Sequence, residues 1–421
     1  MKNSGIDWIG MIPNDWCVEK GKHVFAQRNT KGNETPVLLA ATQKSGMIPQ
    51  SLLEGVVQVK LDTDLQTFKT VHVGDFVISL RSFQGGFEMS DYEGVCSPAY
   101  QVFYSTQDIF HKYYKYLFKS YGFISKMNSL VVGIREGKNI QYKDFAESML
   151  PIPPFPTQQR IANFLDRKCA EIDEFAALQE TMIAELKRYK QSVITEAVTK
   201  GLDPNVPMKD SGVEWVGKIP SHWDSRRIKN IGHSLNGLTY SPADMVSEKE
   251  GILVLRSSNI QGGKLTFDDN VYVSTLIPPS LMVKKGDLII CSRNGSAALV
   301  GKCALVEDDN LKATYGAFMM RFQSVFYGRY IYYLLSSAIS QYKQLFFTTT
   351  INQLTVGTFG GLRMPFTKSD TEQRAIADYL DKKCAEIDEL IAIKQQKIEA
   401  LKEYKKSVIF ECVTGKKEIE K

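Results

Sequence analysis

The chain has 421 residues, of which 43% are hydrophobic and 24% charged, and its formal net charge is +5. This composition is ordinary for a globular protein with two or three domains, and the mild positive charge is as compatible with a solvated surface as with a nucleic-acid partner. Neither a signal-peptide core nor an apolar run long enough for a membrane span occurs, so we expect a cytoplasmic protein without membrane association. Seven scattered cysteines without a CxxC pair indicate reduced thiols, and five histidines without ligand spacing predict no metal site.

A tryptophan box opens the chain and returns in its middle. The segment "WIGMIPNDW" at residues 8–16 is repeated as "WVGKIPSHW" at residues 215–223, and the two boxes contain all four tryptophans. Because the box is nearly the same in both halves, it is unsuited to reading two different targets. We therefore expect the tryptophans to pack in the core or between domains.

Each box is followed by a long region that does not visibly match its counterpart. Both regions contain a Gly-Asp pair, an apolar run and then an arginine, in "GDFVISLRSFQGG" from Gly74 and in "GDLIICSRNGS" from Gly286. The run is apolar on both faces, which predicts a buried strand, and the loop after it is small, polar and rich in glycine. Short strands of this kind predict a mixed α/β domain in each half.

The arginines that follow these strands are positioned to reach outward from the loops. Arginine to guanine, and asparagine or glutamine to adenine, are the commonest bidentate base contacts in DNA. For any single loop an ordinary solvated surface is an equally good interpretation, but the loops together favour DNA contact. The candidate DNA-binding residues are Thr42, Gln43, Lys44, Arg81, Ser82, Gln84, Arg135, Lys138 and Asn139 in the first region, and Arg256, Ser258, Asn259, Arg293, Asn294, Ser296, Thr350 and Asn352 in the second.

A long helix is predicted at the end of each half. The sequence from Thr157 to Thr199 has no proline or glycine, and "QQRIANFLDRKCAEIDE" at residues 158–174 returns as "QRAIADYLDKKCAEIDE" at residues 373–389. Apolar residues recur every seven positions, which favours two helices that pair with each other over two separate amphipathic helices. The predicted helix-pairing residues are Leu165, Ile172, Leu186, Val193, Leu380, Ile387, Leu401 and Val408. A second stripe is predicted through Phe175, Met182 and Tyr189, and through Leu390 and Tyr404.

The duplication predicts the fold class. We expect an α+β protein in which two globular mixed α/β domains are joined by two long antiparallel paired helices, with a pseudo-twofold axis between the halves. The predicted domains are residues 1–155, the first helix at 156–200, the connector and second domain at 201–366, and the second helix at 367–416.

These repeated motifs resemble the specificity (S) subunit of type I restriction-modification enzymes, and the resemblance covers essentially the whole chain. It implies that each variable region is a target recognition domain that reads one half of a bipartite, asymmetric double-stranded DNA site. It further implies that the paired helices set the gap between the half-sites and dock two methyltransferase (M) subunits, and that restriction (R) subunits join this core. The subunit itself would be non-catalytic and without a cofactor, while the complex would carry adenine-N6 methyltransferase and ATP-dependent endonuclease activities.

Two other classes of function remain open at this point. A catalytic DNA methyltransferase or nuclease would need a cofactor loop or an acidic metal site, and the sequence has neither motif. A coiled-coil scaffold without a DNA role would leave the variable domains without a basic face and without affinity for duplex DNA. Binding of S-adenosylmethionine by the chain alone would favour the first class, and absence of DNA binding would favour the second.

Overall fold

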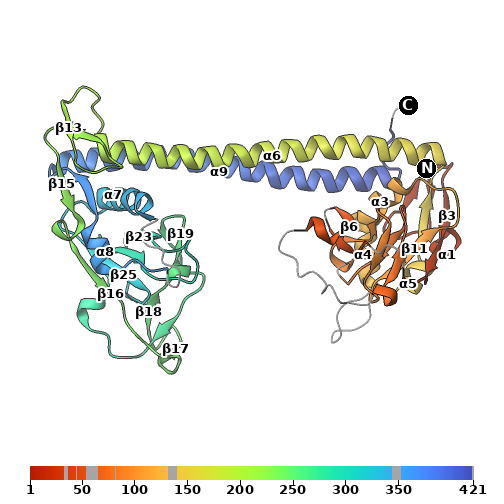
Figure 1. Cartoon of the computed structure of the whole chain (residues 1–421), viewed down its shortest axis with the longest axis horizontal. Coiled ribbons are helices and arrows are strands. Elements are labelled where there is room, and N and C mark those ends of the chain that lie inside the picture. The colour runs from red at the N-terminus through yellow and green to blue at the C-terminus, as the bar shows by residue number, and fades with distance from the viewer. Residues whose placement is uncertain are drawn as a thin grey trace. The chain divides into compact units, whose positions relative to one another are not determined.

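The computed structural model describes residues 1–32, 37–43, 45–53, 65–80, 82–130, 140–343 and 352–419. The chain divides into two compact units, each of which draws on both halves of the sequence. Unit 1 consists of Met1–Glu180 together with Lys394–Lys421, and unit 2 is Thr181–Ile393. Two long helices, α6 (Phe155–Lys200) and α9 (Asp370–Val413), each contribute one part to unit 1 and another to unit 2, and they run side by side in both units (Figure 1).

Local sequence explains where these helices begin and end. Pro156 occupies the first turn of α6, where a missing backbone N–H costs nothing. At the start of α9 the hydroxyl of Ser369 accepts a hydrogen bond from the backbone N–H of Glu372 at 3.3 Å, and acidic residues fill the first turn. Beyond the helix ends, Gly201 and Gly415 adopt φ of +75° and +71°, the left-handed conformation that commonly terminates a helix.

Unit 1 is built around a four-stranded antiparallel sheet in the order β4-β11-β8-β9. Three antiparallel strand pairs, β1–β2, β3–β12 and β5–β6, and the further pair β7–β10 complete its β-structure. The strands are β1 (Lys2–Asn3), β2 (Met11–Ile12), β3 (Cys17–Lys20), β4 (Phe25–Arg28), β5 (Leu39–Thr42), β6 (Gly46–Pro49), β7 (Lys69–Val71), β8 (Phe76–Ile78), β9 (Glu88–Met89), β10 (Gly94–Cys96), β11 (Gln101–Ser105) and β12 (Met149–Ile152). The shorter helices are α1 (Gly21–Val24), α2 (Ser82–Gly85), α3 (His111–Lys119), α4 (Tyr121–Ser129) and α5 (Tyr142–Glu147), with 3-10 turns at Gln50–Leu52 and Leu65–Thr67.

Unit 2 contains an equivalent four-stranded sheet but differs from unit 1 in its other strands and helices. Its antiparallel sheet β16-β25-β22-β23 has the same order as the sheet of unit 1, and a second sheet, β17-β21-β18-β24, includes the parallel pair β18–β24. The strands are β13 (Met208–Asp210), β14 (Lys218–Pro220), β15 (Asp224–Arg227), β16 (His233–Asn236), β17 (Met245–Val246), β18 (Ile252–Leu255), β19 (Ile260–Gln261), β20 (Lys264–Leu265), β21 (Tyr272–Val273), β22 (Leu288–Cys291), β23 (Cys303–Leu305), β24 (Ala313–Tyr315), β25 (Met319–Gln323) and β26 (Arg363–Phe366). The helices are α7 (Gly328–Gln341) and α8 (Val356–Gly361), with 3-10 turns at Ile228–Asn230, Pro242–Asp244, Ser257–Asn259 and Pro279–Leu281.

The tryptophan boxes lie against the helix that belongs to the other half of the sequence. In unit 1, Trp16 is buried in a cluster that includes Val408 and Val413 of α9. In unit 2, Trp223 is buried in a cluster that includes Ala197 and Val198 of α6. The prediction that these tryptophans pack in the core is confirmed, and each box anchors the end of one long helix.

The seam between α6 and α9 follows a heptad pattern of alternating steps of four and three residues. Five of the eight predicted pairing residues are buried, and the other three are partly buried: Leu165, Ile172, Leu380, Ile387 and Val408 in the first group, and Leu186, Val193 and Leu401 in the second. Within unit 1, Lys405 Nζ lies 2.6 Å from the Asp173 carboxylate, and within unit 2, Lys190 Nζ lies 2.7 Å from that of Asp388. These equivalent ion pairs join the beginning of one helix to the end of the other, so the helices are antiparallel, as predicted.

The prediction of the second stripe is wrong. Phe175 and Tyr189 are 61% and 58% exposed, and Met182, Leu390 and Tyr404 are exposed as well. The second seam position is instead occupied, one residue further on, by Cys169, Ala176, Ile183 and Lys190 in α6 and by Cys384, Ile391, Ile398 and Lys405 in α9. A repeat of seven residues is compatible with a partner stripe either three or four residues after the first. Here the stripe with the larger side chains is the exposed one.

Candidate functional site

A buried aspartate shapes the turn that leads into each central strand. Asp75 accepts a hydrogen bond from the backbone N–H of His72 at 2.9 Å, and Asp287 accepts one from that of Lys284 at 2.8 Å. The preceding glycines, Gly74 and Gly286, have φ near +90°, which other residues rarely adopt. Burial raises the pKa of Asp287, although the Lys284 N–H and Arg321 oppose that shift. The Gly-Asp motif therefore marks the start of β8 in unit 1 and of β22 in unit 2, and each strand runs into a loop of its own unit.

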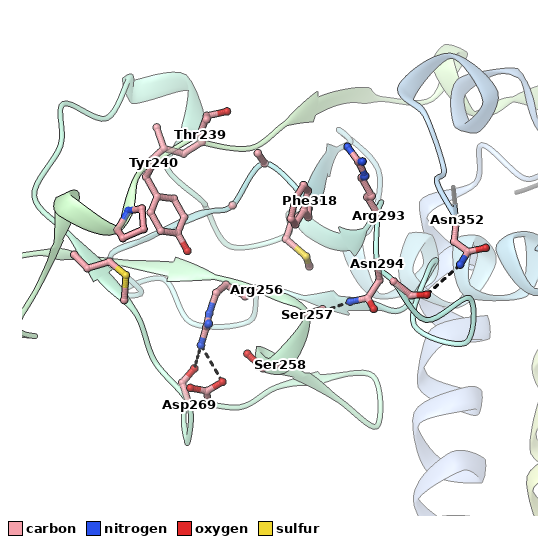
Figure 2. Close-up of a pocket in the computed structure, with 17 residues that line it drawn as sticks. Thr239, Tyr240, Arg256, Ser257, Ser258, Asp269, Arg293, Asn294, Phe318 and Asn352 are labelled. Atoms are coloured by element: carbon pink, nitrogen blue, oxygen red, sulfur yellow. Dashed lines mark hydrogen bonds and ion pairs between the residues drawn. The ribbon is translucent and has the colours of Figure 1, made fainter. Parts of the chain in front are cut away.

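In unit 2 the loop after β22 meets three other segments of the chain around a hollow of about 1040 Å³ (Figure 2). The backbone N–H of Arg293 donates to the carbonyl of Phe318 at 3.1 Å, and Leu354 N–H donates to the carbonyl of Ser292 at 2.7 Å. The Asn352 side chain donates to the Gly295 carbonyl at 3.2 Å. The Asn294 side chain donates to Ser257 Oγ at 3.2 Å. Residues that are far apart in the sequence are thus held at one edge.

Arg293 presents an unpaired cation to this hollow. Its side chain is exposed, and its guanidinium carbon lies 5.4 Å from the ring centroid of Phe318, which is itself 61% exposed. Within the described part of the chain, the guanidinium makes neither a hydrogen bond nor an ion pair. The aromatic ring supports the side chain from one face and leaves its donors to an incoming acceptor.

Arg256, after β18, is held differently. Its Nη2 lies 2.9 Å from Asp269 Oδ2 and donates to the Asp269 backbone carbonyl at 3.0 Å. Asn259 is 0% exposed, and its side chain accepts from the Arg256 backbone N–H at 2.9 Å and donates to the Thr266 carbonyl at 3.0 Å. Asn259, predicted to contact DNA, therefore has its amide bonded within the loop and buried beneath it.

Two further candidates in unit 2 lie on the same loops. Ser258 is partly buried beside Arg256 and also lines the hollow, whereas Ser296 is exposed and its backbone N–H donates to Asn294 Oδ1 at 2.9 Å. Thr350 lies outside the described residues.

In unit 1 the turn between β5 and β6 meets α2. Gln43 Nε2 donates to Gln84 Oε1 at 3.4 Å, and both side chains are exposed. Thr42 has its hydroxyl bonded to the Gly46 carbonyl at 2.9 Å, and Ser82 is buried, where its hydroxyl accepts from Ser79 N–H at 2.8 Å. The structure therefore brings Gln43 and Gln84 together at the surface, and gives Thr42 and Ser82 hydrogen bonds that stabilise the turns.

An ion pair between the buried Glu88 and the partly buried Lys119 supports this turn. Lys119 Nζ contacts Glu88 at 2.5 Å and donates to the Gln43 carbonyl at 3.2 Å. Burial raises the pKa of Glu88 and lowers the pKa of Lys119, since loss of hydration outweighs their mutual attraction. The other candidates of the first region, Lys44, Arg81, Arg135, Lys138 and Asn139, lie outside the described residues.

Most residues that line the hollow of unit 2 were not among the sequence candidates, and three of them carry an aromatic ring or a charge. Tyr240 and Phe318 contribute aromatic rings, and Asp269 contributes a carboxylate. None of them lies in a repeated motif. The exposed Phe318 lies two residues after Gly316 and directly before the buried strand β25, a pattern that is also common in ordinary turns.

Among the residues that the structure describes, no group of three or more histidine, cysteine, aspartate or glutamate side chains is placed to hold a metal ion. In that same part of the chain, no helix has both the length and the apolar character that a membrane crossing requires.

Comparison with known proteins identifies the family. The model of the type I restriction modification DNA specificity domain matches twice, at residues 14–188 and 220–403. The StySPI specificity subunit of Salmonella potsdam is 27% identical over 206 residues, which are 47% of this chain and 44% of that protein. The EcoKI specificity subunit of Escherichia coli K12 is 26% identical over 207 residues, or 48% and 44% of the two chains. The matched part thus spans less than half the length of these two relatives.

Other relatives match along the whole chain. The putative MjaX specificity subunit of Methanocaldococcus jannaschii is 22% identical over 97% of this chain and 95% of that protein. A chain from a solved structure on assembly and conformational transition of the type I R-M system aligns over 96% of this chain and 98% of its own length, with a TM-score of 0.73 and 15% identity. The HsdS subunit from Thermoanaerobacter tengcongensis aligns over the same shares with a TM-score of 0.53 and 15% identity.

Because the family model matches both halves, and the solved chains share the fold, the duplicated plan is that of a known family. The chain belongs to the family of type I restriction modification DNA specificity domain proteins.

Proposed function

We propose that this chain is the DNA-sequence specificity subunit of a type I restriction-modification complex, in which each unit reads one half of a bipartite, asymmetric site on double-stranded DNA. The observation that carries the proposal is that the two units have sheets of the same strand order but carry different polar side chains on the loops beside them. These side chains are Gln43 and Gln84 in unit 1, and Arg293, Asn294 and Asn352 in unit 2. Such side chains are those that pair with base edges.

Catalysis would belong to the partner subunits. The relatives are named as specificity subunits, which supports a chain that recognises sequence. We infer that such a chain needs no cofactor of its own. Adenine-N6 methylation would come from two methyltransferase subunits, and ATP-dependent cleavage from restriction subunits. Methylation mapping of a strain that expresses the complete complex tests this proposal directly: a bipartite motif supports it, and methylation without sequence preference contradicts it.

The exposed apolar residues of α6 and α9 provide the surface on which the methyltransferase subunits would dock. Phe175 and Tyr404 each come directly before a residue of the second seam position. The ion pair between Asp173 and Lys405 joins α6 to α9 close to these two residues in the sequence. In an antiparallel pair, the same flanks of the two helices face one side. Phe175 and Tyr404 therefore form one apolar flank patch in unit 1, which we call patch 1.

Unit 2 carries the equivalent patch. Leu390 and Tyr189 also precede second-position seam residues, and Lys190–Asp388 joins their helices. These two residues, which we call patch 2, correspond to Phe175 and Tyr404 through the duplication. Two equivalent patches fit two copies of one partner, which is the observation that favours two methyltransferase subunits.

The first prediction concerns base reading. Arg293→Ala should weaken discrimination at one base pair of the half-site read by unit 2 by about 1–3 kcal/mol, the range for a bidentate base contact, and leave the other half-site unchanged. Arg81→Ala should do the reverse. Methylation mapping measures both. Arg227→Ala, an exposed arginine on β15 of unit 2, serves as the control. Unchanged methylation in both Arg81 and Arg293 variants would refute their placement.

The second prediction concerns the gap between half-sites. Adding seven residues to α6 after Gln179 and seven to α9 after Lys394 preserves the heptad seam and lengthens each helix by about 10 Å. If the paired helices set the gap, the mapped motif should gain about three base pairs between unchanged half-sites. Four-residue insertions, which shift the seam, serve as the contrast because they should impair pairing. A gap that stays the same with seven added residues would show that the helices do not measure it.

A further inference from the structure

We propose that Asp269 is a specificity-determining residue of unit 2: it keeps Arg256 from acting as a contact to DNA phosphate and leaves that arginine one amino group for a base edge. This inference rests on the proposed function, because it requires unit 2 to bind DNA at the hollow that these residues line.

The geometry divides the donors of Arg256 into three kinds. Nη2 has two hydrogens and two acceptors, both from Asp269: the carboxylate oxygen at 2.9 Å and the backbone carbonyl at 3.0 Å. Nε is buried without a hydrogen-bond partner. Nη1 has no partner among the described residues, and the side chain as a whole is 33% exposed, so Nη1 is the group left to donate. Figure 2 shows the guanidinium directed at Asp269 on the wall of the hollow.

A buried asparagine fixes both members of the pair. Asn259 accepts from the backbone N–H of Arg256 through Oδ1. Its amide nitrogen donates to the Thr266 carbonyl and lies 3.4 Å from the carbonyl of Asp269. One fully buried side chain therefore joins the loop that carries the arginine to the loop that carries the aspartate. The pair is set before DNA arrives, so little side-chain freedom remains to be lost on binding.

The charge of Asp269 decides what Arg256 can bind. A DNA phosphate that binds Nη2 would displace the two hydrogen bonds to Asp269. It would thereby replace the Asp269 carboxylate with another anion and gain no additional charge pairing. An acceptor at Nη1 leaves both bonds intact and adds a third, and because the Asp269 carboxylate repels a phosphate but not a neutral base acceptor, it favours the base. Guanine O6 and N7 are acceptors of this kind in the major groove. The pair thus suppresses the sequence-independent part of binding and retains the base-dependent part.

Arg293 provides the contrast within the same hollow. Its guanidinium is backed by the Phe318 ring and has no carboxylate partner in the described part of the chain. It is therefore free to contact either phosphate or base. Two arginines that line the same hollow differ in whether an acidic residue restricts them, and Asp269 accounts for that difference.

The test uses the full chain assembled with its methyltransferase partner and measures binding to a duplex with the mapped site and to duplexes with single substitutions in the unit 2 half-site. Asp269→Asn keeps the shape but removes the charge. We expect tighter binding to unrelated duplex, a plot of log K against log salt that is steeper by about 0.9, as for one added phosphate contact, and a loss of discrimination on the order of tenfold at one base pair.

Two further variants make the result specific. Asp309→Asn removes the same charge from the Lys285–Asp309 pair, an exposed ion pair of 3.0 Å in the same unit and outside the lining of the hollow, and should leave discrimination unchanged. In an Arg256→Ala background, Asp269→Asn should have no further effect on discrimination. The inference is overturned if Asp269→Asn behaves like Asp309→Asn, or if its effect persists without Arg256. If Arg256→Ala and Arg293→Ala both leave recognition of this half-site intact, unit 2 does not read DNA at the hollow, and the proposed reading surface fails together with the inference.

Discussion

Replacing both aromatic residues of patch 1, in the variant Phe175→Ala/Tyr404→Ala, is expected to remove one of the two methyltransferase subunits from the complex. Burial of a side chain of this size contributes about 1.5–3 kcal/mol, so the double substitution should weaken the affinity at that site by about a hundredfold or more. Neither residue lies in the seam, and the fold of the chain should survive. Sedimentation of the purified complex should show one methyltransferase per chain in place of two.

The duplication supplies a matched experiment. Tyr189→Ala/Leu390→Ala alters patch 2 and should give the same stoichiometry, while the variant with all four substitutions should bind no methyltransferase. Glu180→Ala, an exposed residue of α6 on the opposite flank, should leave two subunits bound. A complex that keeps both methyltransferases after all four substitutions would exclude the two patches as docking surfaces.

Residues 1–207 alone are expected to form a homodimer with a new, symmetric specificity. This half-chain retains box 1, its variable region and the whole of α6. In a dimer, the end of the partner's α6 would take the place of α9: Ala197 and Val198 correspond to Cys412 and Val413, which are buried in unit 1. The ion pair Asp173–Lys405 would become Asp173 with Lys190 of the second copy, which conserves the charges.

The half-chain dimer should recognise a different DNA site from that of the full chain. Co-expressed with the methyltransferase, the half-chain dimer should direct methylation to a palindrome made of the unit 1 half-site and its inverse, so that Arg81 would act twice and Arg293 not at all. Because an intramolecular pairing becomes bimolecular, we expect the dimer to dissociate on dilution. Sedimentation and methylation mapping measure both properties, and a monomer without DNA specificity would contradict the symmetric-halves interpretation.

The frame of the molecule could be predicted from the sequence because it is repeated. Two near-identical helices and two boxes pointed to pairing, to antiparallel direction and to buried tryptophans, and Leu165, Ile172 and Trp16 are all buried. The second helical stripe could not be predicted, because spacing alone does not distinguish a step of three from a step of four. Hydrophobicity then favoured Phe175 over Ala176, although a small residue at the seam lets two helices approach closely.

The loops were harder to interpret because they do not repeat. A polar residue in a loop can face a ligand or hold the loop together, and composition does not separate the two. Arg293 and Asn259 were predicted for the same reason, but Arg293 is exposed and Asn259 is fully buried with its amide bonded to backbone. Asp269 carries no motif, and its relation to Arg256 depends on loop geometry that only the folded chain provides.

Unit 1 combines two segments that are far apart in the sequence, and this affects the order in which the protein folds during synthesis. Its hydrophobic cluster includes Trp16 from the start of the chain together with Val408, Cys412 and Val413 from near the end. The first box is therefore synthesised long before the part of α9 that covers it, and the apolar surface around Trp16 stays open until residues 408–413 have been made. Contacts of such long sequence separation form slowly and leave nascent chains prone to aggregate. The cluster of unit 2 also includes residues of α9, such as Ile376 and Leu380, but these are synthesised before Val408 and Val413, and the part of α6 that packs on Trp223 precedes its box. We therefore expect unit 2 to mature first, and the N-terminal half of the protein to be the last to fold.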